Sequence, residues 1–577
     1  MTLVPTGQSD FRGGAFPLQE DVPPNGCEDI VDGLIRNDGA IERRGGSVYL
    51  GTALTTTTGT TPRWIWDGYM AFGSRTVALF NTQLFVSVSD TSWGSVGDAS
   101  DDRWPATFQR PVAINGLLFG TGTTSLEPLH SLFTTGGATS GANPGTAGTV
   151  SFTQGSAVVT GSGTAFTTGT SPVGFVLRAT SGQAYWMGVA SVQSATQITL
   201  SAPWTGATVS GLTYSWGSAI TWDTLATELE GTSGDSYLAT LYDRLIIARE
   251  RRIIFSQAGN PRHFTADDYH ELSAGSRILG LEPLGDRLMI FTTNGVWALS
   301  NLAYDLTDDL GNPQQRLDQV DSELVLWGDP GIAGWKGAAI IPTTHNVVLF
   351  GPDGSSRPVG DPIRDLYRGY VDAGYAPGFA TVYRSHYFLP IRNGETWVDT
   401  LVCNLDTGAW SRMAGIFSGM TAVTRRSPDG TRSPKFLGLY KTGTTIRGVD
   451  LTGVFSPSST VKNDADGSAH QLKVTTRTQM ASEMVSTFWK KVQIRYELDD
   501  AASDNPTFTA ELAEGRPASS FTSLTGSAVE GELTKRWPIN QRAQQLRVRI
   551  TSNNATSKAI LRAVEFFVRQ TGRQTGR

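Results

Sequence analysis

The six histidines are the first residues to examine for catalytic or metal-binding chemistry, because imidazole titrates near neutral pH and often binds metals. None lies in an HExxH motif or in a Cys/His cluster with the spacing of zinc ligands. His263 and His270 lie close together in the sequence, and Asp267 and Asp268 between them could complete an acid–base group. A polar connecting loop is the better interpretation, so the sequence predicts neither a metal site nor a cofactor. The six are His130, His263, His270, His345, His386 and His470.

Other motifs for catalysis or ligand binding are absent from the sequence or incomplete. Neither GxSxG, the turn of serine hydrolases, nor the phosphate-binding GxxxxGK[ST] occurs. Two acidic segments partly match calcium loops. In one, Asp305 and Asp309 have ligand spacing but Gly311 falls one residue late; in the other, residues 463–467 follow a lysine where the first ligand should stand. Solvated turns explain both segments better than calcium sites.

One segment resembles a motif of glycan-cleaving enzymes. The sequence NLDTGAW at 404–410 is similar to a shortened Asp-box of the sialidase propellers, where such turns are structural. A hydrolase of that kind also needs arginines for the substrate carboxylate and a tyrosine nucleophile with a nearby glutamate. Four arginines are candidates, yet they lie in repeat-like strands where exposed charges are expected, so we predict no enzymatic activity. The four are Arg244, Arg249, Arg251 and Arg252.

A repeated hairpin pattern supplies the elements that would position these residues. The run YDRLIIARERRIIFSQAGNPRHF at 242–264 is followed at 285–300 by GDRLMIFTTNGVWALS, with looser versions at 338–354, 385–410 and 434–450. Each has two short apolar runs around a polar turn, which is typical of a β-hairpin. A unit of about 40 to 50 residues has the size of a propeller blade, and such units close into a ring to bury both faces. The pattern predicts one propeller of about six or seven blades.

The composition indicates a large, turn-rich β protein. The chain has 577 residues with 65 glycines, 15 tryptophans, 39% apolar and only 17% charged residues. Its net charge of −6 argues against nucleic-acid binding through a general basic surface, but it allows a role in which DNA slides past. Cys27 and Cys403 are far apart, which is typical of unpaired thiols in a reducing compartment. The N-terminal residues lack the pattern of a secretory signal, and no apolar run reaches the roughly 20 residues of a membrane span.

Changes of composition divide the chain into several domains and predict a mainly β fold. The predicted architecture is a β-propeller with an inserted small β-barrel or sandwich domain and a C-terminal β-sandwich. Inserting a domain into a loop between two blades has a small entropic cost, because the cost of closing a loop grows only slowly with its length. The predicted parts are an extended N-terminal arm (1–62), the first part of the propeller (63–146), the inserted β-domain (147–217), the second part of the propeller (218–453), and the C-terminal sandwich with a basic tail (454–577).

Strand patterns support the two smaller domains. Between residues 149 and 216 only Arg178 is charged, and period-2 strands alternate with short turns there. In the C-terminal part, the same period places Val492, Ile494 and Tyr496 on one face of a strand.

Two stretches within the propeller do not read as strands. Residues 359–371 predict a short helix, with Asp361 placed to cap it and Pro362 at its first position. Residues 305–324 are polar and acidic, and we expect them to form a protruding loop or short helix.

With the blades placed, the sequence resembles the tail nozzle proteins of short-tailed bacteriophages, also called tail tubular or packaged-DNA stabilisation proteins. The likeness lies in FSQAGNP at 255–261 and FTTNGVW at 291–297, and it is densest over 237–370. The segments at 159–166 and 194–206 resemble a small β-barrel module common in phage tail proteins, and RWPINQRAQQLRVRI resembles the C-terminal sandwich of the same group.

The resemblance implies a subunit of a ring, usually a hexamer, that lies below the portal and the head-to-tail adaptor in the virion tail. Its lumen would conduct DNA without sequence-specific binding, and its outer face would receive tail fibres. The protein would be made in the host cytoplasm. A glycan-binding or glycan-hydrolysing tail adhesin with a propeller remains the alternative; it should gather aromatic residues and carboxylates at one blade mouth.

A channel gives the acidic stretch at 305–324 a possible role, because carboxylates lining a lumen would repel DNA phosphates. The alternative is a solvated outer loop. The side chains that we expect to face the channel are Asp305, Asp308, Asp309, Asp318, Asp321 and Glu323.

Overall fold

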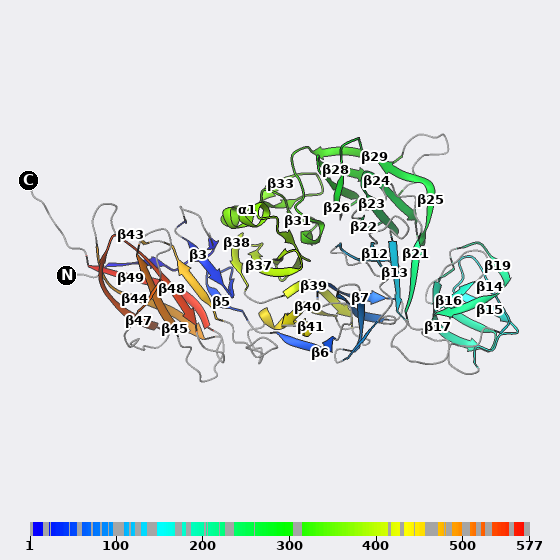
Figure 1. Ribbon diagram of the computed structural model, residues 1–577, viewed down its shortest axis with the longest axis horizontal. Coiled ribbons are helices and arrows are strands. Elements are labelled where there is room, and N and C mark those ends of the chain that lie inside the picture. The colour runs from blue at the N-terminus through cyan, green and yellow to red at the C-terminus, as the bar shows by residue number, and fades with distance from the viewer. Residues whose placement is uncertain are drawn as a thin grey trace, which may run out of the picture.

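The computed structural model is built almost entirely of β-strands, in three parts that lie in a row (Figure 1). The sandwich is at one end, the propeller in the middle and a small barrel at the other end. No helix among the described residues is long and apolar enough to cross a membrane. The structure describes residues 4–15, 22–23, 25–44, 47–54, 61–70, 73–80, 83–89, 92–95, 109–114, 117–121, 129–134, 147–167, 176–179, 186–200, 203–204, 206–217, 220–225, 236–258, 260–303, 314–413, 417–426, 432–442, 445–455, 471–477, 479–480, 487–498, 508–514, 521–524, 534–552 and 559–569.

The propeller has seven antiparallel blades among the described residues, and strands of neighbouring blades contact each other, as β22 does with β26 and β39 with β7. Blade 1 consists of β7 (Pro62–Met70), β8 (Gly73–Phe80), β9 (Gln83–Ser89) and β10 (Ser92–Ser95). Blade 2 consists of β11 (Val112–Ile114), β12 (Leu117–Thr121), β13 (Leu129–Thr134) and β21 (Ile220–Leu225). Blade 3 consists of β22 (Ser236–Leu241), β23 (Arg244–Arg249), β24 (Arg252–Gln257) and β25 (Asn260–Glu271). Blade 4 consists of β26 (Ile278–Leu284), β27 (Arg287–Thr292), β28 (Gly295–Ser300) and β29 (Arg316–Asp321). Blade 5 consists of β30 (Ala333–Trp335), β31 (Ala338–Pro342), β32 (Val347–Phe350) and β33 (Ser356–Pro358). Blade 6 is β34 (Ala376–Pro377) and β35 (Thr381–Tyr383), both paired with β36 (His386–Asn393), then β37 (Thr396–Asn404) and β38 (Ala409–Arg412).

Hydrophobic cores between neighbouring blades hold the ring together. In β27 of blade 4, Leu288 and Ile290 pack toward blade 3, whereas Met289 and Phe291 pack toward blade 5. All four side chains are fully buried. Both faces of this blade are therefore apolar, which explains why its central strand reads as a continuous apolar run.

Blade 7 closes the ring with a strand from the N-terminal part of the chain. Strands β39 (Phe417–Arg426), β40 (Arg432–Thr442) and β41 (Thr445–Asp450) are completed by β6 (Val48–Leu54), which pairs with β41. The prediction of an extended arm over 1–62 is therefore wrong for its described residues, whose strands β1 to β6 belong to three sheets, the two of the sandwich and blade 7. These strands are short and pair with partners hundreds of residues away, so the local sequence shows little of their pairing.

The barrel interrupts blade 2, between its third strand β13 and its outer strand β21. We expected it between two blades, and the structure places it within one. Its sheet has the order β19-β14-β15-β18-β17-β16-β20, and only Thr213 separates β19 from β20, so the sheet closes on itself. The strands are β14 (Thr149–Phe152), β15 (Val158–Ser162), β16 (Val176–Ala179), β17 (Trp186–Ser194), β18 (Gln197–Leu200), β19 (Val209–Leu212) and β20 (Tyr214–Gly217).

The sandwich combines N-terminal and C-terminal strands in two sheets. One sheet has the order β4-β5-β49-β44-β47, with β1 on β49; the other continues from blade 6 as β38-β3-β42-β48-β45-β46, with β2 on β3 and β43 on β48. Val492, Ile494 and Tyr496 all face its core, as predicted. The strands are β1 (Val4–Gln8), β2 (Gly14–Ala15), β3 (Gly26–Val31), β4 (Gly33–Ile35), β5 (Ile41–Arg43), β42 (Lys473–Thr476), β43 (Gln479–Met480), β44 (Thr487–Leu498), β45 (Phe508–Glu514), β46 (Thr522–Ser523), β47 (Thr534–Ala543), β48 (Gln545–Ser552) and β49 (Ala559–Arg569).

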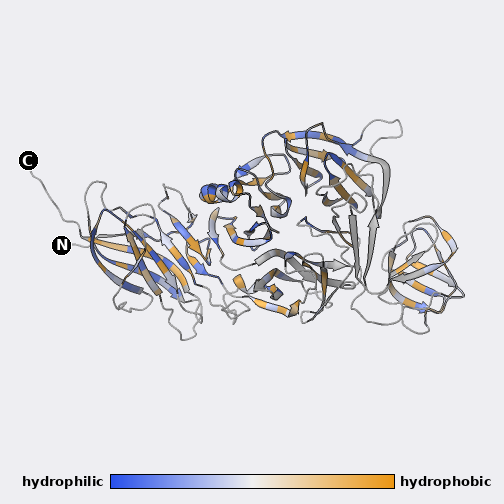
Figure 2. Cartoon of the chain, viewed as in Figure 1, coloured by the Kyte–Doolittle hydropathy of each residue, from blue (hydrophilic) through white to orange (hydrophobic). Residues whose placement is uncertain are grey.

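The predicted fold class, a mainly β chain with a propeller, an inserted β-barrel and a C-terminal sandwich, is confirmed. The predicted short helix is also present, as the 3-10 turn η2 (Asp361–Ile363) followed by α1 (Arg364–Asp372), most of whose residues are hydrophilic (Figure 2). The Asp361 side chain does not cap it, and contacts Arg364 and Asn346 instead. Two further 3-10 turns are η1 (Asp329–Gly331) and η3 (Thr452–Phe455).

Candidate functional site

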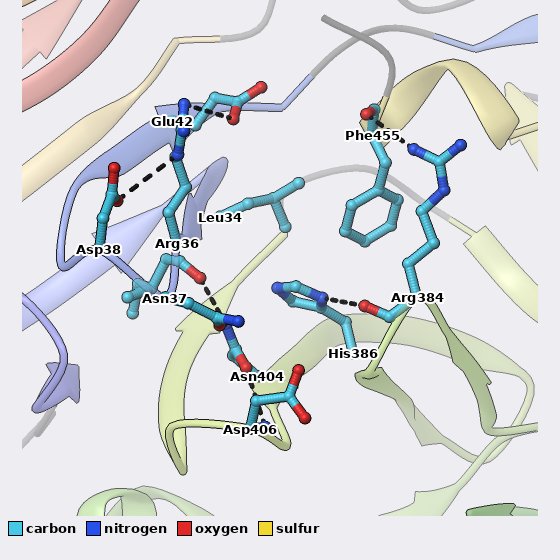
Figure 3. A pocket seen from close by; sticks show the side chains of 11 residues that line it. Leu34, Arg36, Asn37, Asp38, Glu42, Arg384, His386, Asn404, Asp406 and Phe455 are labelled. Atoms are coloured by element: carbon cyan, nitrogen blue, oxygen red, sulfur yellow. Dashed lines mark hydrogen bonds and ion pairs between the residues drawn. The ribbon is translucent and has the colours of Figure 1, made fainter.

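A pocket of about 380 Å³ lies where the sandwich meets blade 6 (Figure 3). The β4–β5 hairpin forms one side, and β36, the end of β37 and η3 form the other. Its lining mixes charges of both signs with amide and apolar side chains. The lining residues are Leu34, Ile35, Arg36, Asn37, Asp38, Glu42, Arg384, His386, Asn404, Asp406 and Phe455.

Asn404 connects the two sides of this pocket. Its Nδ2 donates to the carbonyl oxygen of Ile35 at 2.7 Å and to Oδ1 of Asn37 at 3.1 Å. Its Oδ1 accepts from the backbone N–H groups of Asp406 and Thr407. Asn404 is 3% exposed, so the Asp-box-like turn holds the N-terminal hairpin against blade 6 through buried hydrogen bonds.

His386 lies on the floor of the pocket beside the ring of Phe455, with 4.9 Å between the ring centroids. Its Nδ1 is 2.9 Å from the carbonyl oxygen of Arg384. Burial lowers the pKa of His386, an effect that backbone contacts and the carboxylates of Asp406 and Glu42 partly oppose. The imidazole is therefore neutral at neutral pH.

The charged groups around His386 are mostly engaged. Arg36 lies 3.5 Å from Asp38 and 3.8 Å from Glu42, and Arg562 of β49 reaches Asp38 at 2.6 Å. Arg384 donates to the carbonyl oxygen of Phe455 at 3.1 Å. The pocket thus joins the sandwich to the propeller through polar contacts and offers no nucleophile with an adjacent base among the residues that line it.

A second cluster at the same junction centres on Arg412 of β38. Its guanidinium contacts both carboxylate oxygens of Asp29 in β3, at 3.1 and 2.7 Å, and Asp399 of β37 at 3.1 Å. The Tyr370 hydroxyl donates to Asp399 at 2.7 Å, and burial raises the pKa of this tyrosine. At this point β38 of blade 6 pairs in parallel with β3 of the sandwich, with Val31 opposite Arg412, so one sheet is continuous between the two domains.

A third cluster lies at the inner strands of the propeller. Arg110, just before β11 of blade 2, donates to Glu282 of blade 4 at 2.7 Å and to both carboxylate oxygens of Asp329 in η1, at 3.0 and 2.9 Å. Burial disfavours the charge on Arg110, but the two carboxylates outweigh it and raise the pKa of Arg110. Gly280 allows this close approach, because a Cβ there would lie 2.9 Å from Asp329. One guanidinium therefore ties blades 2, 4 and 5 together near the axis.

The acidic residues expected to face a channel fall in two places. Asp305, Asp308 and Asp309 lie outside the described residues. Residues 316–321 are not a loop but β29, the outer strand of blade 4. Outer strands face solvent and are polar, which is why this strand read as a loop.

Two of the three described acidic residues of that stretch, Asp318 and Asp321, have ordinary local partners for their carboxylates. Asp318 pairs with exposed Arg316 at 2.6 Å. Asp321 accepts from the backbone N–H groups of Glu323 and Leu324 at the end of the strand. Their role in a channel stays a prediction.

The four candidate arginines do not converge on one site. Arg249 is fully buried and donates to the hydroxyl of Ser236, and Arg244 donates to the carbonyl oxygen of Ser256. Arg251 pairs with Glu271 at 2.7 Å, whereas Arg252 lies over the ring of Tyr269. Only Arg251 and Arg252 share a partner, the Glu271 carboxylate, which lies 2.7 and 3.9 Å from them. The four arginines therefore do not form one carboxylate-binding cluster.

The segment around His270 is also a strand rather than the polar loop that we predicted. It forms β25, the outer strand of blade 3, and His270 Nε2 lies 2.9 Å from Oε1 of Gln315. The described residues hold no group of three or more His, Cys, Asp and Glu side chains that could bind a metal. The possible calcium loop at 463–467 lies outside the described residues.

Sequence reasoning missed both Arg110 and the docking role of Asn404. The Asp-box-like turn was a signal for the conformation at Asn404, but not for its contact with a hairpin 369 residues away in sequence. Arg110 stands alone before a short strand, and no local pattern marks its partners.

No family model matches the chain, and no curated protein matches it. Among solved structures, a streptogramin B lyase is 8% identical, with 70% of this chain and 97% of that chain covered and a TM-score of 0.36. An exo-β-1,3-galactanase from Phanerochaete chrysosporium is 11% identical, with 90% and 100% covered and a TM-score of 0.21. TM-scores this low carry no argument about function, and the fold rests on the strand pairing described above.

Proposed function

We propose that this chain is a structural subunit of the tail nozzle of a short-tailed bacteriophage. In this proposal, several copies, six on the grounds of the resemblance, form a ring that retains and then conducts the genome. The ring would bind the head-to-tail adaptor and carry tail fibres in the virion. The sequence likeness is densest over 237–370, which corresponds to blades 3 to 5 and α1.

The observation that best supports this proposal is the arrangement of three β-modules in a row, with a domain on each flank of the propeller (Figure 1). A closed ring of identical copies needs two different surfaces on each subunit that fit each other. The sandwich and the barrel, on opposite flanks, provide two separate surfaces of this kind. The sheet shared by blade 6 and the sandwich would fix their relative orientation.

The Arg110 cluster bears on where a conduit could lie. Arg110, Glu282 and Asp329 connect blades across the inner side of the propeller, and the Asp329 side chain is only 3% exposed. In the proposed ring, the genome would therefore pass between subunits and not along the axis of one propeller.

The test is the mass of the purified protein in solution, measured with and without its head-to-tail adaptor. We expect a closed oligomer, with adaptor binding to the oligomer. Hydrolysis of polysaccharide and sialoside substrates should be assayed on the same preparation, and none is expected. A protein that stays monomeric under both conditions and cleaves a surface glycan would overturn the proposal in favour of the adhesin.

A further inference from the structure

Charge is distributed unevenly along this chain. Residues 471–577 contain 16 Lys and Arg against 10 Asp and Glu, whereas residues 1–470 contain 31 against 43. The C-terminal strands of the sandwich thus carry a basic excess within a protein of net charge −6. A local excess of this kind creates a binding surface for anions that the overall charge conceals.

Part of this excess gathers on the solvent face of the β44–β47 pair. Strand alternation directs Trp489, Val492 and Trp537 into the core, so the intervening residues point outward. Lys490 and Lys491 are consecutive residues of β44, at a β-bulge where the register with β47 shifts. After the bulge, Lys491 lies opposite Pro538 of β47. We call the four outward cations the basic patch: Lys490, Lys491, Arg536 and Arg542.

The two lysines of the basic patch are supported by aromatic rings. Lys490 Nζ lies 4.6 Å from the ring centroid of Phe488, and Lys491 Nζ lies 4.2 Å from that of Phe567. Such contacts orient an ammonium group without neutralising it. Arg536 donates from Nε to the neutral Gln493 at 2.6 Å.

Within the described part of the sandwich, the four cations of the basic patch have no carboxylate at ion-pair distance. Other arginines on the same sheet do: Arg495 pairs with Glu565, and Arg562 pairs with Glu497 at 2.7 Å and with Asp38. The charge of the basic patch is therefore available to an external anion.

The surroundings of the basic patch indicate which kind of polyanion fits. A protein partner would need apolar or aromatic surface at the centre of the contact. The exposed large apolar side chains of the described residues are Val48, Val158, Tyr242, Tyr269 and Val398, and none lies in β42–β49. A phosphate backbone needs only positioned cations and releases counterions when it binds.

We propose that the basic patch binds the phosphate backbone of duplex DNA without reading its sequence. The basic patch lies on two paired strands of a sheet and presents no helix that would enter a groove, so contacts to base edges are not expected. The acidic excess of residues 1–470 would repel the same duplex, which confines contact to the C-terminal strands of the sandwich. Only the identification of this DNA with a packaged genome rests on the proposed function.

The experiment measures binding of the full chain to a short fluorescent DNA duplex by anisotropy between 50 and 200 mM salt. Four phosphate contacts predict a slope of log K against log salt of about −3.6, which is an affinity loss of about 150-fold over that range. A variant with all four cations replaced should have a slope near zero; it combines Lys490→Gln, Lys491→Gln, Arg536→Gln and Arg542→Gln. Each single substitution should reduce the magnitude of the slope by about 0.9.

A matched control removes the same charge elsewhere, from exposed cations of blade 5, its outer strand and α1. This variant combines Lys336→Gln, Arg357→Gln, Arg364→Gln and Arg368→Gln, and it should retain the wild-type slope. Equal loss of binding in both variants would show that only net charge matters, and would overturn the proposal. So would wild-type protein that binds polyglutamate but not DNA.

The mass of the same preparations separates this inference from the proposed function. A monomer that binds DNA through the basic patch would contradict the ring and leave the patch in place. A closed ring that does not bind DNA would contradict the patch alone.

Discussion

The sandwich and the barrel are both attached to the propeller, but their attachments differ in kind. The sandwich shares a continuous sheet with blade 6 and exchanges apolar side chains with it: Ala409 of blade 6 lies in the core of the sandwich, and Leu34 of the sandwich lies in the core between blades 6 and 7. The barrel is entered from β13 and left into β21, and its core consists of its own residues. We infer that the sandwich and propeller unfold together, whereas the barrel unfolds by itself.

The largest expected effect comes from the buried pair at the junction, between Arg44 and Asp32. Their side chains are 1% and 6% exposed, and the two groups lie 2.7 Å apart. Asp32→Asn keeps the size of the side chain and its left-handed backbone conformation but removes the charge that compensates Arg44. We expect a loss of about 3–5 kcal/mol in unfolding free energy, measured by urea denaturation.

Asp38→Asn is the matched control for this variant, because it removes a carboxylate from a more exposed pair with Arg562. Its cost should be about 0.5 kcal/mol. Equal costs for the two variants would contradict a junction stabilised by buried charge.

Asn404→Ala should have the next largest effect. It removes four hydrogen bonds of this buried side chain, two of which join blade 6 to the β4–β5 hairpin, with a cost of about 2–3 kcal/mol. The propeller and sandwich, which should melt in one calorimetric transition in the wild type, should then separate into two. Asn346→Ala, at an exposed turn of blade 5, is the control and should leave a single transition.

A smaller effect should depend on pH through His386. Its pKa is lowered in the folded protein, so the unfolded chain binds more protons as the pH falls below about 6.5. Stability is therefore fully present above that pH and decreases as the pH falls toward the folded-state pKa. His386→Gln should make this decrease shallower, measured as unfolding free energy from pH 7.5 to 5.

Part of the pH dependence should persist in the His386→Gln variant. Burial also lowers the pKa of His270 in blade 3, where a hydrogen bond with Gln315 partly opposes the shift. His270→Gln should remove that remaining part. An unchanged pH profile in the double variant would exclude both histidines as its source.

Excision of residues 147–217 should have the smallest effect on the rest of the molecule. With the flanking linkers rejoined, we expect a protein whose main melting temperature shifts by no more than about 2 °C and which still assembles. Differential scanning calorimetry should show that only one transition, that of the barrel, is lost. Collapse of the whole fold would contradict an independently folded barrel.

The sequence predicted the parts of the fold that depend on local patterns. Hairpins with apolar strands and polar turns indicated the blades, and alternation placed Val492, Ile494 and Tyr496 on the core face. It could not predict that β6 closes blade 7, because pairing with β41 joins residues almost 400 positions apart. The prediction of a loop or short helix at β29 was wrong, because an outer strand exposed to solvent has the composition of a loop.

The candidate sites were harder to predict than the fold. The Asp-box-like turn marked Asn404 as a turn residue, but its partners Ile35 and Asn37 belong to a hairpin that read as an extended arm. The cations of β44 and β47 are visible in the sequence. That the four cations of the basic patch have no carboxylate at ion-pair distance among the described residues appears only when the two strands pair and the neighbouring charges can be placed.

Electron microscopy of the purified full-length protein tests the central claim most directly. The proposed nozzle subunit should give closed rings with rotational symmetry, about six subunits each on the grounds of the resemblance, with the same subunit surfaces in contact around the ring. Single, unassociated three-part particles at every concentration tested, with and without the head-to-tail adaptor, would contradict the account.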